Sequence, residues 1–174
     1  LSLFGRSDLK TANNLEFPER PFSITGKNLI LGMYVNELLY RLLEKYDPLE
    51  SVFDSYEYLL QKLEKLNNPI SSLREFELNL LKDLGYGINF HTDSVSGDAV
   101  SAGSHYNFFV NEGFRKTIEP DEMSFRGDEI QLIALGKLEE VQAKKVLSLT
   151  RRSLASLLDN TPLTSRAIFS GLIE

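Results

Sequence analysis

The feature that most constrains the fold is the stretch from Asn68 to Gly87, which has the pattern of a helix with its own start and stop signals. Asn68 can cap the first amides of a helix, and Pro69 suits the first helical position because it has no N–H to leave unpaired. Apolar residues then recur at helical spacing and form one stripe of Leu73, Phe76, Leu80, Leu81 and Leu84. Gly85 can adopt the left-handed conformation that ends a helix. The stretch therefore predicts an amphipathic helix that packs against a core.

Two further amphipathic helices precede this stretch. The first begins at Thr25, and its apolar stripe comprises Leu31, Tyr34, Val35, Leu38, Leu39, Leu42 and Leu43. Asp47-Pro48 ends that helix, because a proline disfavours the helical conformation of the residue before it. The stripe of the second helix comprises Val52, Phe53, Tyr56, Leu59, Leu60 and Leu63. Three consecutive amphipathic helices with short connections predict a small antiparallel helical core.

Residues 86–127 differ in character, because glycines recur there with serines and aspartates between them. The run Tyr106–Val110 has the composition of a strand, and Asn111-Glu112-Gly113 has that of a hairpin turn. A second strand is expected at Phe114–Ile118. The sequence therefore predicts a small β appendage, at about residues 88–120, inserted between helices.

Helical patterns return after the appendage. Gly127 precedes a short helix from Asp128 to Leu135, and a longer helix is expected from Leu138 to about Leu158. Pro162 interrupts the pattern before a last short helix that begins at Ser165. The expected fold class is mainly α, with a helical bundle and a small β appendage.

The longer helix carries four basic residues, Lys144, Lys145, Arg151 and Arg152, at spacings of seven and eight. These spacings place the four side chains near one face of a helix, where clustered cations can neutralise phosphates. The alternative is an ordinary solvated helix face, which composition alone favours.

Composition excludes several classes of protein. The chain has no cysteine, which rules out disulfides, thiolate catalysis and Cys-ligated zinc. Its formal charge of −6 argues against a protein that coats nucleic acid with its whole surface, but leaves room for a local basic patch. No apolar run approaches the roughly 20 residues that span a bilayer, so no membrane partner is expected. The first residues, Leu1 to Arg6, do not have the pattern of a signal peptide.

Four segments, in the same order, resemble the RecO family of bacterial recombination mediators. They are Gly5–Thr11, Gly32–Arg41, Leu73–Gly87 and Pro162–Phe169, and together they extend over the chain from end to end. The resemblance implies that residues 1–25 are the remnant of an N-terminal OB-like barrel, most of which would lie upstream of Leu1. It implies that residues 26–174 form the helical C-terminal domain. Many members carry a four-cysteine zinc site in the appendage, but here His91, Ser94 and Gly97 stand at the expected positions. No metal or other cofactor is therefore expected.

The resemblance also implies a function without catalysis. Members of the family bind single- and double-stranded DNA, anneal complementary strands, and help to load the recombinase onto DNA covered by the single-stranded-DNA-binding protein. The expected partner is RecR, and the expected location is the cytoplasm of a bacterium, near the nucleoid. The candidate DNA-contacting residues lie on the longer helix, downstream of it and on the barrel remnant. They are, in that order, Lys144, Lys145, Arg151 and Arg152, then Arg166, and then Arg6 and Lys10.

A second implied activity is capture of the acidic, Phe-ending tail of the single-stranded-DNA-binding protein. Such a tail requires an apolar pocket with an arginine at its rim. The candidates are Arg74 with Leu73 and Phe76, and also Arg41. The alternative for both arginines is a surface pair along one helix, Arg74 with Glu77 and Arg41 with Glu37 or Lys45.

Two other classes of function stay open on the sequence alone. The first is a metal-dependent enzyme that uses His91, Asp93 and His105, with Asp98 nearby. No nucleophile elbow, phosphate-binding glycine loop or zinc-protease helix motif supports catalysis, and Glu37, Glu75 and Glu77 are expected in surface pairs. The second is an interaction module that binds proteins and no DNA.

Overall fold

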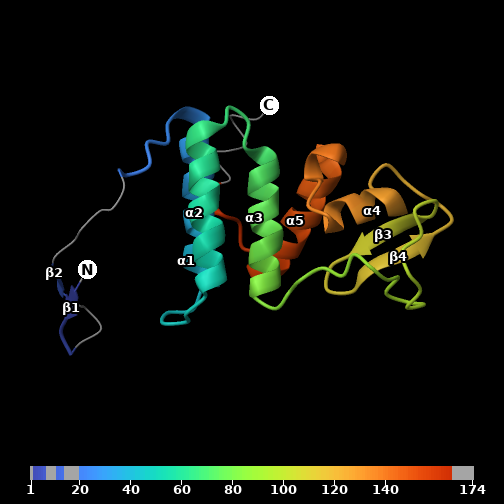
Figure 1. Cartoon of the computed structure of the whole chain (residues 1–174). Coiled ribbons are helices and arrows are strands. Elements are labelled where there is room, and N and C mark those ends of the chain that lie inside the picture. Colours follow the sequence, from blue (N-terminus) through green and yellow to red (C-terminus); the bar gives the residue numbers. More distant parts are fainter. Residues whose placement is uncertain (1, 7–10, 14–19, 166–174) are drawn as a thin grey trace.

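The computed structural model describes residues 2–6, 11–13 and 20–165 of the chain. The described residues form the helices α1 (Gly26–Leu42), α2 (Glu50–Lys65), α3 (Ile70–Asp83), α4 (Gly127–Ala134) and α5 (Ala143–Leu157), and the short 3₁₀ helix η1 (Leu138–Glu140). Figure 1 shows α1, α2 and α3 side by side, and α5 between α3 and the strands β3 and β4. Among the described helices, none is long and apolar enough to cross a bilayer. The mainly helical fold with a β appendage is thus confirmed.

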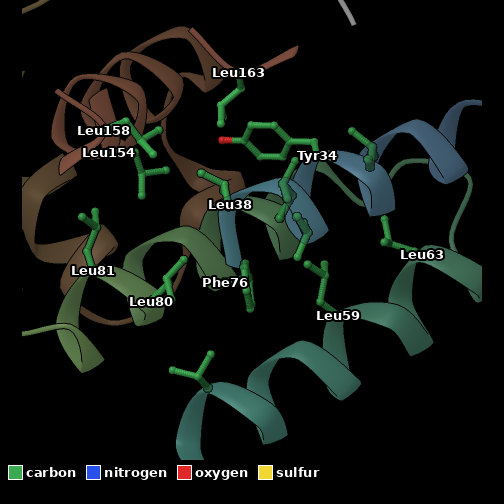
Figure 2. Close-up of a cluster of buried hydrophobic side chains, with 14 residues drawn as sticks. Tyr34, Leu38, Leu59, Leu63, Phe76, Leu80, Leu81, Leu154, Leu158 and Leu163 are labelled. Atoms are coloured by element: carbon green, nitrogen blue, oxygen red, sulfur yellow. The ribbon is translucent and has the colours of Figure 1, made fainter. Parts of the chain in front are cut away.

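The first core, here called the helical core, lies between α1, α2, α3 and the end of α5. Figure 2 shows its buried side chains, among them Leu38 of α1, Leu59 of α2 and Phe76 of α3. The predicted stripe of α3 is buried at Leu73, Phe76, Leu80 and Leu81, each with an exposed fraction of 2% or less. The predicted stripe of α2 is wrong at Phe53, whose side chain is 66% exposed.

The ends of α3 confirm one sequence signal and correct another. Asn68 was expected to cap this helix, but the capping position is held by Pro69, and no side chain caps the helix there. The physical reason is that α3 begins one residue later than expected, at Ile70. At the other end, Gly85 has φ +86, as predicted. The amides of Gly85 and Tyr86 donate to the carbonyls of Lys82 and Leu81 at 3.0 and 2.8 Å, which closes the helix end.

The hairpin near the N-terminus pairs β1 (Ser2–Phe4) with β2 (Thr11–Asn13) in an antiparallel register. Figure 1 shows these two strands away from the helices. Their assignment to the remnant of an OB-like barrel, with a domain boundary at residue 25, stays a prediction.

The β appendage is a three-stranded antiparallel sheet in the order β4-β3-β5. Its strands are β3 (His105–Phe109), β4 (Gly113–Thr117) and β5 (Phe125–Arg126). The predicted hairpin is confirmed, and its turn is made by two residues with positive φ, Asn111 at 63° and Gly113 at 101°. The third strand, β5, was not expected from the sequence.

A second core, here called the sheet core, packs one face of this sheet against α4, η1 and the first half of α5. The Phe114 ring lies at its centre, with the Phe108 ring centroid 5.3 Å away and the Phe125 ring centroid 5.4 Å away. The helix α5 joins the two cores, because Val146 and Leu149 belong to the sheet core while Leu154 belongs to the helical core.

The single helix predicted from Leu138 to about Leu158 is wrong in one respect. It is divided into η1 and α5 by Val141, which is extended with φ −109 and ψ 148. Both Leu138 and Val141 are buried in the sheet core. The extended backbone at Val141 ends the short helix, and α5 begins two residues later, at Ala143.

Candidate nucleic-acid interface

The four basic residues predicted to form one stripe on α5 do not share one exposed face. Lys144, Arg151 and Arg152 are exposed, but Lys145 is only 7% exposed. The Lys145 ammonium group donates to Glu129 of α4 at 2.7 Å and lies 5.7 Å from the centroid of the Phe125 ring. Lys145 is therefore a structural residue, and its prediction as a phosphate contact is not supported by its placement.

The remaining three basic residues leave a small cationic surface on α5. No carboxylate of the described residues pairs with Arg151. The Arg152 guanidinium lies 5.6 Å from the centroid of the Phe108 ring. Lys144 forms an ion pair with Glu122 at 3.3 Å, and both side chains are more than half exposed. Exposed pairs of this kind contribute little to stability, so a phosphate can replace Glu122 at low cost.

The other predicted DNA contacts lie outside this surface. Arg6 is exposed and lies in the segment that connects β1 and β2. Lys10 and Arg166 lie outside the described residues. Of the predicted contacts within the described residues, the structure therefore brings together Lys144, Arg151 and Arg152, and the roles of all these residues stay predictions.

A cavity opens beside Arg152, where the helical core meets the sheet core. We call it the junction cavity, and its volume is about 390 Å³. Its lining includes Leu81, Tyr86 and Ile88 from α3 and the following loop, Phe108 and Asn111 from the hairpin, and Ser153 from α5. No local sequence pattern indicates this cavity, because its lining comes from three segments that are distant along the chain.

The residues predicted to hold a peptide tail lie largely in the interior. The exposed fractions of Leu73, Phe76 and Arg74 are 0%, 2% and 8%. Leu73 and Phe76 thus present no surface to a peptide in this conformation. Their role in tail binding stays a prediction that the geometry does not favour.

A buried polar network surrounds Arg74. Its guanidinium forms an ion pair with Glu77, whose side chain is fully buried, and donates to the Thr150 hydroxyl at 3.2 Å. The Tyr34 hydroxyl donates to the other Glu77 oxygen at 2.7 Å. The expected partner of Arg74 is thus correct, but the expected surface location of Glu77 is wrong. The network ties α1, α3 and α5 together.

Arg41 and Glu37 hold the segment that follows α5. The exposed Arg41 donates to the carbonyl of Pro162 at 3.1 Å. The Glu37 carboxylate accepts hydrogen bonds from the amides of Thr164 and Ser165, both at 2.8 Å, and from the Ser165 hydroxyl at 2.6 Å. Glu37 was expected in a surface pair, but it anchors this segment to α1. In the sequence, Pro162 followed by Thr164 and Ser165 indicates the start of a helix, whose first amides need a hydrogen-bond acceptor.

The pKa of Glu37 reflects this anchoring. Partial burial pushes the pKa upward, but the Ser165 hydroxyl, the two backbone amides and the nearby Arg41 charge together lower the pKa of Glu37 from 4.5 to about 2. A carboxyl whose pKa is depressed on folding stabilises the fold at every pH above its unfolded value. That contribution is complete above pH 4.5 and is lost as the pH falls towards about 2.

We expect Glu37→Gln to lower the free energy of unfolding by about 1–2 kcal/mol at neutral pH, a value reduced for solvent screening. The difference between this variant and the parent protein should narrow as the pH falls below about 4.5, because the parent then loses its charge as well. Urea unfolding at several pH values measures this. Glu75→Gln, at an exposed position of α3, is the matched control. A difference that stays constant with pH would contradict the assigned role of the Glu37 charge.

The loop considered for metal binding uses its central carboxylate for backbone contacts. Asp93 accepts hydrogen bonds from the amides of Val95, Ser96 and Lys116 at 2.8, 2.9 and 2.6 Å. These bonds, led by those from Ser96 and Lys116, hold the pKa of Asp93 below its usual value of 3.8. Within the described part of the chain, no three His, Asp or Glu side chains are grouped so that they could hold a metal ion. The loop built from His91, Asp93 and His105 thus offers no ligand cluster there.

Comparisons with known proteins agree with this architecture. The family model described as "Recombination protein O C terminal" matches residues 25–167. The DNA repair protein RecO of Psychromonas ingrahamii is 35% identical over 173 residues, which cover 98% of this chain and 74% of that protein. RecO of Aliivibrio salmonicida is 36% identical over 169 residues, which cover 95% of this chain and 70% of that protein. RecO of Serratia proteamaculans is 35% identical over 172 residues, with 98% and 71% covered. The chain therefore belongs to the RecO family.

Proposed function

We propose that this chain acts in DNA repair and recombination as a mediator that binds DNA and catalyses no reaction. Family membership supports the repair role, since the similar proteins carry the name DNA repair protein RecO. The single structural observation that carries the DNA-binding part is the exposed cationic surface of α5, on which Arg152 lies beside the junction cavity. The proposed work is annealing of complementary strands and recombinase loading, done in the cytoplasm by binding energy alone.

Charge explains why this small surface matters. The chain carries a formal charge of −6, so most of its surface repels a polyanion. DNA must then approach where cations are concentrated and not neutralised by neighbouring carboxylates. Arginine suits this task, because its planar guanidinium can donate two parallel hydrogen bonds to a phosphate. Arg151 and Arg152 satisfy both conditions, and Lys144 adds a third cation once Glu122 is displaced.

We expect the double variant Arg151→Ala/Arg152→Ala to bind single-stranded DNA more weakly and with a smaller dependence on salt. Loss of two phosphate contacts should reduce the slope of log affinity against log salt by about 1.4, because each contact to a single strand contributes about 0.7. Fluorescence anisotropy of a labelled oligothymidylate, titrated at several salt concentrations, measures both quantities.

The matched control for this experiment removes the same charge elsewhere. Lys45→Ala/Lys65→Ala replaces two exposed lysines, one after α1 and one at the end of α2. A salt slope that falls equally in both double variants would place the DNA contact elsewhere. No salt-dependent binding by the parent protein would refute the DNA-binding role and favour an interaction module that binds proteins only.

Capture of the tail of the single-stranded-DNA-binding protein, and action together with RecR, form the remaining part of the proposal. Both rest on the family resemblance. Among the four residues predicted for the tail, Arg41 is the one with an exposed side chain. Its guanidinium already donates to the carbonyl of Pro162, so a tail carboxylate would have to share it or displace that carbonyl.

A further inference from the structure

The junction cavity has the position and the chemistry of a site for a single nucleobase. We propose that it binds one unstacked base of single-stranded DNA, while the adjoining phosphate lies on Arg152. The inference rests on the proposed function and adds a subsite to it. The size of the cavity, its aromatic walls, its polar groups and its charges support this assignment.

Size and depth suit a ligand of this kind. A volume of about 390 Å³ lies at the lower end of the range of small-molecule sites, about 300–1,000 Å³. The deep wall is apolar, because Leu81 and Phe108 are 1% and 6% exposed. These side chains belong to the helical core and the sheet core respectively, so the wall is held by packing on both sides.

Aromatic residues stand where a base would enter. Tyr86 lines the cavity with a side chain that is 54% exposed, directly after the glycine that ends α3. The Phe108 ring lines the cavity as well, and Arg152 lies over it at 5.6 Å. A base that stacks on Tyr86 therefore has a guanidinium close by for its phosphate. This pairing of an aromatic platform with a cationic track is how proteins hold single strands without reading their sequence.

One polar side chain is free to meet the edge of a base. Asn111 lines the cavity at the turn of the β3–β4 hairpin. Its amide makes no hydrogen bond to any other described residue, and an amide offers both donors and an acceptor. Asn89 also lines the cavity, but its amide is occupied by the Thr92 hydroxyl and the His91 amide at 2.8 Å each.

The charges of the lining favour a base over an acidic peptide. Glu112 contributes to the lining at the hairpin turn, and its carboxylate pairs with Arg115. A peptide with several carboxylates would meet this like charge, which disfavours binding. A neutral base would not, and its N–H groups, such as the ring N3–H of thymine, can donate to a carboxylate. The phosphates of the strand would lie on the α5 side, away from Glu112.

The test compares two labelled oligonucleotides of equal length and charge, an oligothymidylate and its abasic counterpart. We expect the parent protein to bind the base-containing strand about tenfold more tightly at the same salt concentration, as stacking on one aromatic residue predicts. Tyr86→Ala and Asn111→Ala should each reduce this preference. Both should leave the salt slope unchanged, since neither removes a cation.

Tyr40→Ala is the matched control, because Tyr40 is 87% exposed on α1 and does not line the cavity. Salt-dependent binding without a preference for the base-containing strand would overturn the base site and leave the proposed function standing. An absence of salt-dependent binding to either strand would contradict both the base site and the proposed function. If Tyr86→Ala weakened an acidic, Phe-ending peptide but left the base preference intact, the cavity would be a peptide site and the inference would be wrong.

Discussion

Replacing Gly127 with alanine is expected to destabilise the protein by about 3 kcal/mol, although alanine is the better helix former. Gly127 is the first residue of α4, and a Cβ atom there would lie 2.0 Å from the carbonyl oxygen of Ser101 and 2.6 Å from its carbonyl carbon. These are backbone atoms, so no side-chain rotation can relieve the overlap. Urea unfolding followed by circular dichroism measures the loss.

The contact cannot shift easily, because hydrogen bonds hold the two segments together. The amide of Gly127 donates to the carbonyl of Ser104 at 2.9 Å, and that of Asp128 donates to Ala102 at 3.3 Å. Gly103→Ala is the matched control, since a Cβ atom at that position would meet nothing within 4 Å. We expect the control to change stability by less than about 0.5 kcal/mol. Equal stability of the two variants would show that the loop moves aside freely.

The helices α1, α2 and α3 could be predicted because their signals are local. Each carries an apolar stripe at helical spacing, and α3 ends at Gly85 in the left-handed conformation that its position predicts. The β3–β4 hairpin was predictable for the same reason, from one turn sequence between two aromatic runs. The strand β5 was not, because two residues are too few to show a period, and they pair only with His105 and Tyr106 of β3.

The candidate site was less predictable, because tertiary contacts decide which charges are free. Sequence spacing placed Lys145 beside Arg152, but Glu129 of another helix pairs with Lys145 and its side chain is buried. The partner of Arg74 follows from the spacing of three residues along α3. The burial of the Arg74–Glu77 pair does not follow from this spacing, because it depends on Tyr34 and Thr150 from two other helices. The junction cavity depends on three distant segments and left no local pattern.

The placement of α5 would connect the stability of the fold with the proposed DNA binding. One face of α5 contributes Val146 and Leu149 to the sheet core and Leu154 to the helical core. The exposed face carries Arg151 and Arg152. The same helix thus fixes the cavity walls relative to the cations, so a base and its phosphate would meet a preorganised surface.

The second large effect is expected at the buried ion pair. Arg74→Ala should cost about 3–5 kcal/mol, because it leaves the Glu77 carboxylate fully buried without its counter-charge. Replacing both partners, as Arg74→Met/Glu77→Leu, should cost much less, since apolar residues of similar volume often substitute for a buried pair. Urea unfolding of the single and double variants measures the difference. Equal losses of stability in the single and the double variant would show that the missing counter-charge does not cause the destabilisation.

This difference also decides how tail binding must be tested. A peptide copying the acidic, Phe-ending tail would lose affinity for Arg74→Ala even if Arg74 never touched it, because that variant is expected to be partly unfolded. The double variant keeps the fold and removes the guanidinium, so it separates the two causes. If it binds the peptide as tightly as the parent protein does, Arg74 acts only within the core. If it folds normally and binds no peptide, the buried arginine must become accessible when the tail docks.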